Sequence, residues 1–146
     1  MRALIQRVRR ASVTVDEAMV GSIEHGLLIL LGIAPDDGEA EGVWMVRKIS
    51  GLRIFSDENG RFDRSVVDVG GSVLVVSQFT LFGDCRKGRR PNFSGAARPE
   101  HAAPMWERVC AGFEAAGIPT ARGRFAADMQ VELLNDGPVT LMLETP

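Results

Sequence analysis

Histidine and cysteine are scarce in this chain, which has two of each among its 146 residues. His25 and His101 are far apart in the sequence, and Cys85 and Cys110 show neither zinc-ligand nor redox spacing. The chain also lacks an HExxH motif, a CxxC pair and a glycine-rich phosphate loop. These absences exclude the common metal-binding and nucleotide-binding sites, so we expect no bound metal and no cofactor.

Long apolar runs and an excess of positive charge are lacking too. The longest apolar run, residues 26–34, is well below membrane-spanning length and is typical of a buried strand. No signal peptide precedes the first strand-like segment, so we expect a cytoplasmic protein. The formal net charge of −2 excludes a protein that coats nucleic acid through bulk positive charge. We therefore expect neither a membrane nor DNA as a partner, and any RNA contact must be local.

The composition that is present suits one folded domain. Hydrophobic residues make up 45% of the chain and charged residues 25%, which provides enough apolar surface for an ample core. No internal repeat, low-complexity tract or linker-like change of composition divides the sequence. We therefore expect residues 1–146 to form a single domain.

The N-terminal segment is predicted to be a strand. Apolar side chains of one parity recur along it, namely Ala3, Ile5, Ala11, Val13 and Val15. Arg7 and Arg9 share that parity. Either a bulge near Arg9 and Arg10 turns them toward solvent, or an inward arginine has an anionic or carbonyl partner.

The remaining segments show strand and helix patterns in turn. We expect a short strand before a turn at residues 24–26, further strands at 26–34, 52–55, 72–82, 129–135 and 139–144, and helices within 38–55 and 99–117. The second helix has an apolar side that includes Trp106, Phe113 and Ala116, and Gly117 ends it. This order predicts an α+β domain with a mostly antiparallel, curved, barrel-like sheet and two main helices, without regular βαβ alternation.

A turn-like sequence separates the last two predicted strands. Asp136-Gly137 between alternating hydrophobic residues is the strongest short-range hairpin signal. A hairpin needs no proline after it, however, and Pro138 removes a strand N–H donor. The Gly137-Pro138 peptide is also one of the few bonds that adopts the cis form at modest cost. The stretch either ends a strand or presents an unusual backbone.

Polar side chains interrupt the predicted strand at residues 72–82. Strand parity places Gln78 and Thr80 on one face, and Ser77 and Phe79 on the other. Hydroxyl and amide groups at the end of a buried strand suit the lining of a polar ligand site. They suit a structural hydrogen-bond network equally well, and parity does not decide between the two.

The following loop contains a thiol and a group of cations. Asp84, Cys85 and His101 form a candidate thiol hydrolase triad, and the alternative is an inert loop thiol. The cations are Arg86, Lys87, Arg89, Arg90 and Arg98, and Phe93 lies among them. This combination suits phosphates and a stacked base, although composition alone favours a solvated loop.

Two motifs about fifty residues apart, SQFTLFGD at 77–84 and NDGPVT at 135–140, resemble the signature motifs of D-aminoacyl-tRNA deacylases. Further stretches agree with that family: IQRV, LRIF followed by FDRSV, KGRRPNF and FAADMQVELLNDGPVT. The resemblance covers essentially the whole chain. One departure is Ala126, which stands where we expect glycine.

The resemblance implies the fold of that family and an enzyme that hydrolyses the ester of D-aminoacyl-tRNA and of glycyl-tRNA. It implies a homodimer that binds the acceptor end of the tRNA. The Gly137-Pro138 bond would be cis and would reach into the partner's site, where two backbone carbonyls reject an L side chain. Arg7 would hold this turn through its carbonyls.

The resemblance also assigns the site residues. Thr80, Gln78 and Phe79 are the expected catalytic group, with backbone N–H groups around Phe79 and Thr80 as donors to the oxyanion. Ser77, Leu81, Met129, Gly137, Pro138 and Arg7 are the expected substrate-binding residues. The nucleophile would be a water, assisted by the substrate's own 2′-hydroxyl, or the Thr80 hydroxyl. A thiol esterase that uses Cys85 and a non-enzymatic RNA-binding module are the two alternatives.

Overall fold

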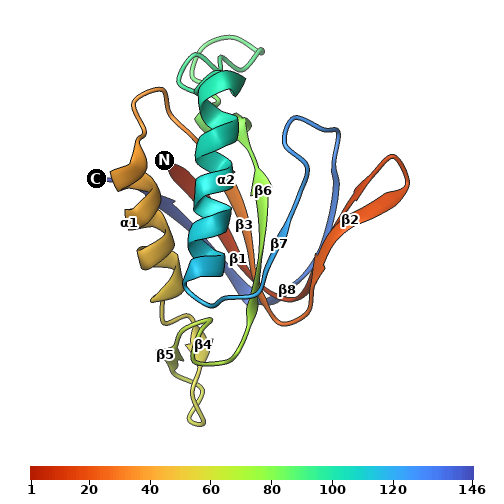
Figure 1. The fold of residues 1–146 in the computed structure, drawn as a ribbon, viewed down its shortest axis with the longest axis vertical. Helices are drawn as coiled ribbons and strands as arrows, with labels where there is room; N and C mark the ends of the chain where they lie inside the picture. The colour runs from red at the N-terminus through yellow and green to blue at the C-terminus, as the bar shows by residue number, and fades with distance from the viewer.

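The computed structural model describes residues 1–146, which form a curved six-stranded sheet with two helices against it and a separate two-stranded hairpin (Figure 1). In chain order the elements are β1 (Arg2–Val15), β2 (Ala18–Ile23), β3 (Gly26–Gly32), α1 (Glu39–Ser50), β4 (Phe55–Ser56), β5 (Phe62–Arg64), β6 (Ser72–Ser77), the 3₁₀ helix η1 (Phe79–Phe82), α2 (Pro99–Ala115), β7 (Thr120–Arg122) and β8 (Gln130–Glu144). No helix is long and apolar enough to cross a membrane.

The long strand β1 organises the sheet. It pairs antiparallel with β2, β3 and β8, while β3–β6 and β6–β7 are parallel. The sheet curves until β2 approaches β7, where a Cβ added to Gly21 would lie 2.5 Å from the carbonyl oxygen of Arg122. The predicted α+β class, with a mostly antiparallel and barrel-like sheet, is confirmed.

Part of the sheet is parallel, which the sequence pattern did not indicate. Helix α1 lies between β3 and β6 in the chain, and α2 lies between β6 and β7, so two βαβ crossovers are present. Parallel neighbours require such long crossovers because a short turn cannot return the chain to the same end of the sheet. Strand β7 has only three residues, which is too short to give a recognisable sequence pattern.

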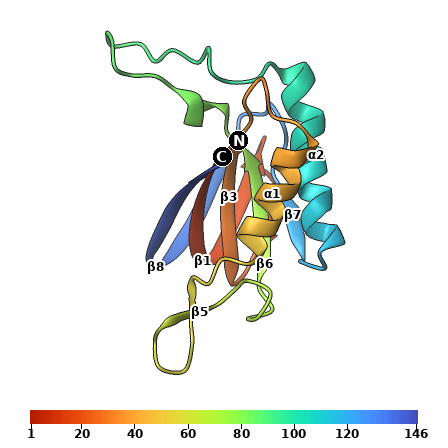
Figure 2. The same cartoon turned by 90° about the vertical axis from the view of Figure 1, so that its left-hand side faces the viewer.

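Both helices cover the same face of the sheet (Figure 2). Alternation along β3 sends Leu27 and Ile29 toward the helices, where they join Met45 and Phe113 in the larger core cluster. Leu28 points the other way, into a second cluster inside the curve of the sheet. A sheet buried on both sides explains why residues 26–34 are apolar without interruption.

Bulges adjust the parity of β1. Its pairing with β8 shifts register between Gln6 and Val8 and again between Val8 and Arg10. The five apolar residues of the predicted parity are all buried, and Val8 joins them. Arg9 and Arg10 are exposed, so the predicted bulge is confirmed, whereas the Arg7 side chain is only 11% exposed and needs partners.

The hairpin signal at Asp136-Gly137 does not produce a hairpin, and the two strands predicted at 129–135 and 139–144 are one strand, β8. Residues 130–144 run as one strand along β1, with Val8 opposite Asn135 and Gln6 opposite Thr140, so only an insertion separates the two halves. The Asn135 side chain bridges it: Oδ1 accepts from the Val139 N–H at 2.8 Å, and Nδ2 donates to the Val139 carbonyl at 3.2 Å. These bonds return the chain to its original direction, and a reversal does not occur.

The other corrections concern element ends. Residues 52–54 are not a strand, because the Leu52 N–H bonds to the Ile49 carbonyl and the Ile54 N–H to the Leu52 carbonyl, which keeps the chain turning. Only Phe55–Ser56 pairs, in the β4–β5 hairpin. Helix α2 ends before Gly117 as predicted, but Ala116 is exposed.

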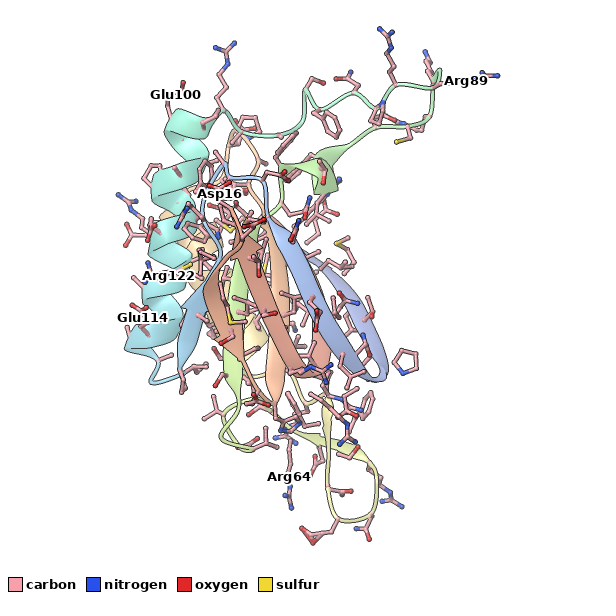
Figure 3. All side chains as sticks on the ribbon, turned by 90° about the vertical axis from the view of Figure 1, so that its right-hand side faces the viewer. Asp16, Arg64, Arg89, Glu100, Glu114 and Arg122 are labelled. Carbon is pink, nitrogen blue, oxygen red and sulfur yellow. The ribbon has the colours of Figure 1, made fainter.

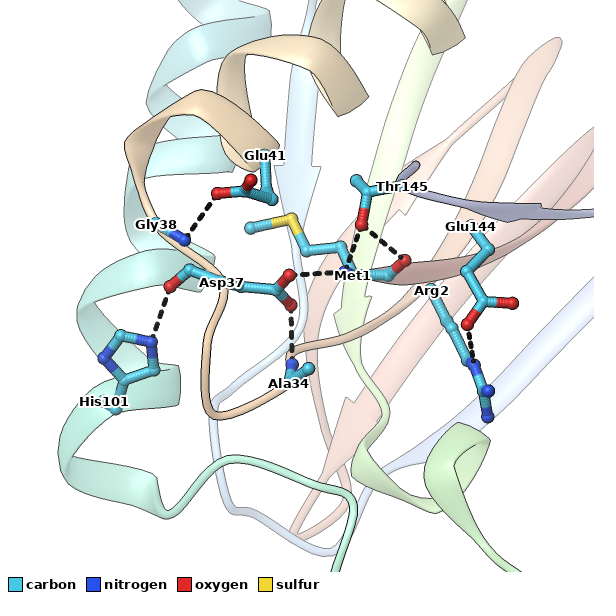
Figure 4. A network of polar contacts seen from close by, with 9 residues as sticks. All are labelled: Met1, Arg2, Ala34, Asp37, Gly38, Glu41, His101, Glu144 and Thr145. Carbon is cyan, nitrogen blue, oxygen red and sulfur yellow. Dashed lines mark hydrogen bonds and ion pairs between the residues drawn. The ribbon is translucent and has the colours of Figure 1, made fainter.

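A polar network joins the ends of β1 and β8 to the loop before α1 (Figure 4). The Met1 ammonium group donates to Asp37 Oδ1 at 2.6 Å and to Thr145 Oγ1 at 2.7 Å. Asp37 Oδ2 accepts from the Ala34 N–H at 2.6 Å, and its carbonyl oxygen lies 2.7 Å from His101 Nε2. Asp37 is only 6% exposed, so it is a buried carboxylate with a complete set of partners.

Candidate active site

A pocket of about 600 Å³ opens at the ends of the parallel strands β3 and β6. Its walls come from these strand ends, the loop before α2, the start of α2 and the segment before β8. Most of the lining is apolar, and Ser77, Gln78 and Arg98 supply polar groups. An apolar cavity with a few polar groups at the carboxyl ends of parallel strands is a typical ligand site.

The end of β6 differs from the prediction of a strand through residue 82. The Gln78 N–H donates to the Leu31 carbonyl at 2.8 Å, and Gln78 then turns out of the sheet at φ −144° and ψ 77°. Residues Phe79–Phe82 form η1, so the expected alternation of faces does not apply there. The first N–H groups of a helix have no partner within it. Here they belong to Phe79, which lines the pocket, and to Thr80, the next residue.

The Thr80 side chain has one hydrogen-bond partner. Gln78 Nε2 donates a hydrogen bond to Thr80 Oγ1, so the hydroxyl oxygen is an acceptor in this contact. No histidine, lysine or carboxylate hydrogen-bonds to Thr80. Asp84 is occupied by Arg86, whose side-chain hydrogen bonds lower the pKa of that carboxyl group and make it a poor base.

Phe79, Leu81 and Met129 occupy different parts of the site. The Phe79 ring is 57% exposed and packs edge-on against Phe93 at 5.1 Å between centroids. Met129 lines the pocket, and its Sδ accepts from the Arg124 N–H. Leu81 lies outside the lining, and its carbonyl oxygen accepts from Arg2 at 3.1 Å. Leu81 therefore connects η1 to β1.

Ala126 lines the pocket at φ 59°. This left-handed conformation costs an L-residue roughly 1–2 kcal/mol and costs glycine almost nothing. The geometry explains why glycine was expected at this position.

Arg7, Gly137 and Pro138 lie at the other end of the sheet. Arg7 pairs with Leu27, whereas Arg2 pairs with Gly32 beside the pocket, so five residues of strand, roughly 16 Å, separate the two ends. In Figure 3 this far end is the one marked by Arg64, opposite Arg89 and Glu100. A chain's own Gly137 and Pro138 therefore do not line its pocket.

The turn at that far end is exposed, and Arg7 of β1 holds its base. The Gly137-Pro138 bond is cis, as the resemblance implied. Arg7 Nε donates to the Asp136 carbonyl at 2.7 Å, and Arg7 also donates to the Ile54 carbonyl at 2.6 Å. Arg7 therefore holds the turn through the carbonyl that precedes Gly137, and not through those of Gly137 and Pro138.

The structure thus brings Ser77, Gln78, Phe79 and Met129 together, with Thr80 and Leu81 beside them. Sequence reasoning missed Phe125 and Val131 as lining residues. Their positions depend on the curvature of the sheet, which leaves no local signal.

The thiol hydrolase triad gains no support. Cys85 is exposed, His101 bonds to the Asp37 carbonyl, and Asp84 bonds to Arg86. No group of three His, Cys, Asp or Glu side chains is arranged to hold a metal ion.

Comparison with known proteins places this geometry in a family. The family model for D-Tyr-tRNA(Tyr) deacylase matches residues 4–144. Proteins named D-aminoacyl-tRNA deacylase from Desulforudis audaxviator and Koribacter versatilis are 54% and 56% identical over 145 residues, which is 99% of this chain and 97% of each relative. The protein of that name from Heliobacterium modesticaldum is 57% identical over 144 residues, 99% of this chain and 96% of its own.

Two solved structures share the fold. One, described as the c-Myc DNA unwinding element binding protein, has a TM-score of 0.94 at 42% identity and covers 100% of this chain and 99% of its own. The other, a probable eukaryotic D-amino acid tRNA deacylase, has a TM-score of 0.87 at 17% identity over 97% of both chains. With its two motifs, its pocket and a match to the family model over residues 4–144, this chain belongs to the D-Tyr-tRNA(Tyr) deacylase family.

Proposed function

We propose that this protein hydrolyses the ester between a D-amino acid and the terminal adenosine of tRNA, releasing the free D-amino acid and the tRNA. The observation that carries the proposal is the pocket at the ends of β3 and β6, which has Ser77, Gln78 and Phe79, the first residue of η1, in its lining. The relatives named D-aminoacyl-tRNA deacylase support this substrate.

The chemistry needs a positioned water and stabilisation of negative charge. Water adds to the ester carbonyl carbon, and the N–H groups of Phe79 and Thr80 donate to the oxygen that becomes negative. The bond to the ribose oxygen then breaks, and that oxygen takes up the proton that the water loses. The neighbouring ribose hydroxyl assists because covalent geometry already holds it beside the ester. The pocket contributes orientation, and no side-chain base is required.

Chiral selection is assigned to the turn of a second subunit. In this arrangement the carbonyls of Gly137 and Pro138 of the partner subunit stand beside the chiral carbon and collide with an L side chain. A D side chain points away, and glycine has no side chain to reject, so glycyl-tRNA is also a substrate. The turn is exposed and lies far from its own pocket, which supports a role in another subunit.

A homodimer provides the receiving surface. Strand β8 pairs on one side only and exposes Leu134, Leu141 and Met142, whose side chains are 43%, 37% and 52% exposed. An open edge strand with exposed apolar side chains is a surface that proteins normally cover. A two-fold dimer would cover it and would form two equivalent sites, each completed by the other chain's turn. The aminoacyl-tRNA substrate places this activity in the cytoplasm.

The direct test compares matched D- and L-aminoacyl-tRNA and follows ester loss. We expect rapid loss of the D-ester, some loss of glycyl-tRNA and almost none of the L-ester. A thousandfold preference corresponds to about 4 kcal/mol of transition-state free energy, which a hard steric clash supplies. Equal rates on the two enantiomers would refute the proposal. Sedimentation of a fully active monomer would refute the shared site.

A further inference from the structure

A basic arm, residues 84–92, projects from the rim of the pocket. Its two ends are joined by reciprocal backbone hydrogen bonds between Asp84 and Asn92, at 2.8 and 2.9 Å. Figure 3 shows Arg89 at the outer end of the arm, away from the sheet. At about 3.3 Å per residue, the five residues from Asp84 to Arg89 reach at most ~16 Å from the rim.

The arm carries cations that no carboxylate neutralises. Lys87, Arg89 and Arg90 are exposed and take part in no ion pair. Arg86 differs, because Asp84 accepts from its Nε at 2.9 Å and from its terminal nitrogen at 2.6 Å. Three unpaired cations thus gather on one short segment of a chain whose net charge is negative. Such a segment attracts a polyanion locally and not through the charge of the whole protein.

The base of the arm is fixed relative to the pocket. Phe93, the residue after the arm, packs edge-on against Phe79, and both rings line the pocket. Gly83, just before the arm, packs closely against the Phe93 ring: a Cβ added at Gly83 would lie 3.0 Å from it. The base of the arm is therefore held beside the place where an ester would bind, and its cations lie within ~16 Å of the rim.

We propose that this arm binds the sugar-phosphate backbone of RNA on the 5′ side of the terminal adenosine, through Lys87, Arg89 and Arg90. The assignment rests on the proposed function. If the pocket holds the terminal adenosine, the phosphates that precede it in the RNA must pass over the rim of the pocket, where the arm begins. Phosphate contacts position a nucleic acid without reading its sequence. The arm therefore suits an enzyme that accepts the acceptor ends of many tRNAs.

Binding is the first test, and it does not depend on catalysis. Fluorescence anisotropy measures the affinity of the protein for a labelled RNA minihelix with a single-stranded CCA end. Replacing Lys87, Arg89 and Arg90 together by Ala is expected to weaken binding about tenfold or more at low salt. The slope of log affinity against log salt should become shallower by about 2 to 3, at 0.7 to 0.9 per lost phosphate contact. An unchanged affinity and slope would overturn the proposal.

A charge-matched control separates the arm from bulk charge. Lys48, Arg61 and Arg108 are also exposed and without ion pairs, and they lie on α1, the β4–β5 hairpin and α2. Their joint replacement by Ala removes the same charge. It is expected to leave the affinity within about twofold, because salt screens charges that lie far from the bound RNA. Equal losses from both triple variants would show a bulk charge effect and would overturn the arm's role.

Kinetics supply the second test. The arm variant should lose about tenfold or more in kcat/KM on D-aminoacyl-tRNA and nothing on D-aminoacyl-adenosine, which has no phosphate. Equal losses on both substrates would place these residues in the pocket and overturn the proposal. If the unaltered protein hydrolyses neither ester, the proposed function fails, whereas the minihelix measurement still decides whether the arm binds RNA.

Discussion

Arg7 Nε lies 2.7 Å from the carbonyl oxygen of Asp136, the residue that leads into the exposed turn at Gly137 and Pro138. The contact is a hydrogen bond from a charged donor whose side chain is 11% exposed, and it fixes the base of the turn.

Replacing Arg7 by Ala should therefore lower D-aminoacyl-tRNA hydrolysis at least tenfold, because the turn loses its position in the partner's site. Stability should fall by about 1.5–3 kcal/mol, the usual contribution of hydrogen bonds to a charged group. The matched control is Arg9→Ala. It also removes an arginine that contacts Asp136, through the carboxylate at 3.3 Å, but the Arg9 side chain is 70% exposed and does not hold the base of the turn. Normal activity of a folded Arg7→Ala dimer would contradict this role.

The backbone donors at η1 give a sharper prediction. Proline at position 79 removes one N–H group and is tolerated at the first position of a helix. We expect Phe79→Pro to lower kcat by about 10²–10³, as loss of an oxyanion donor does. Phe79→Ala keeps the N–H group and controls for loss of the ring. Equal losses in the two variants would assign the effect to the side chain.

The nucleophile can be assigned by changing enzyme and substrate separately. Thr80 has no base in contact, so Thr80→Val should reduce the rate only modestly. A tRNA that ends in 2′-deoxyadenosine and is charged on its 3′-hydroxyl should bind but hardly react. An inactive Thr80→Val protein with a normal deoxy substrate would indicate a Thr80 acyl-enzyme, which mass spectrometry would detect.

Asp37 should matter for stability and not for chemistry. Asp37→Asn removes the charge that pairs with the Met1 ammonium group, which is itself buried. Leaving a buried charge without its partner costs about 3–5 kcal/mol, measurable by urea denaturation. Glu144→Gln breaks the exposed pair with Arg2 and should cost less than about 1 kcal/mol. A loss of under 1 kcal/mol from Asp37→Asn would show that the pair is not important.

Stability at alkaline pH should depend on Cys110. Burial raises the pKa of this thiol to about 12, whereas an unfolded thiol titrates near ~8.5. The folded state keeps a proton that the unfolded state releases, so this contribution is complete below ~8.5 and is lost as the pH rises toward 12. Unfolding free energy should therefore fall more steeply above about pH 8.5 in the unaltered protein than in Cys110→Ala. Parallel curves would contradict the prediction.

Local patterns predicted most of the fold. The parity of β1 and both helices follow from side-chain periodicity, which acts over a few positions. Residues 78–82 were misassigned because their apolar content suits a strand. Gln78 makes the last bond to Leu31 and then turns out of the sheet into η1, where Arg2 of β1 bonds to the Leu81 carbonyl. Tertiary context decided that segment.

The site was predicted in parts. Ser77, Gln78, Phe79 and Met129 line one pocket, but their assignment came from the family resemblance, since strand parity did not decide between a ligand site and a structural network. Phe125 gave no signal, because only the curvature of the sheet brings it to the pocket. The positions assigned to Gly137 and Pro138 remain a prediction, since they involve a second chain.

The Asn135 bridge lets β8 carry an exposed insertion at the edge of the sheet. Four residues, 136–139, stand where Arg7 on β1 would normally face one, yet pairing resumes at Thr140. Because the amide of Asn135 supplies the bonds that a neighbouring strand would otherwise give, the excess residues leave the flanking pairing intact. Gly137 and Pro138 are exposed, whereas Val139 is 8% exposed and belongs to the core. The part of the turn proposed to select the substrate is thus separate from the part that packs into the domain.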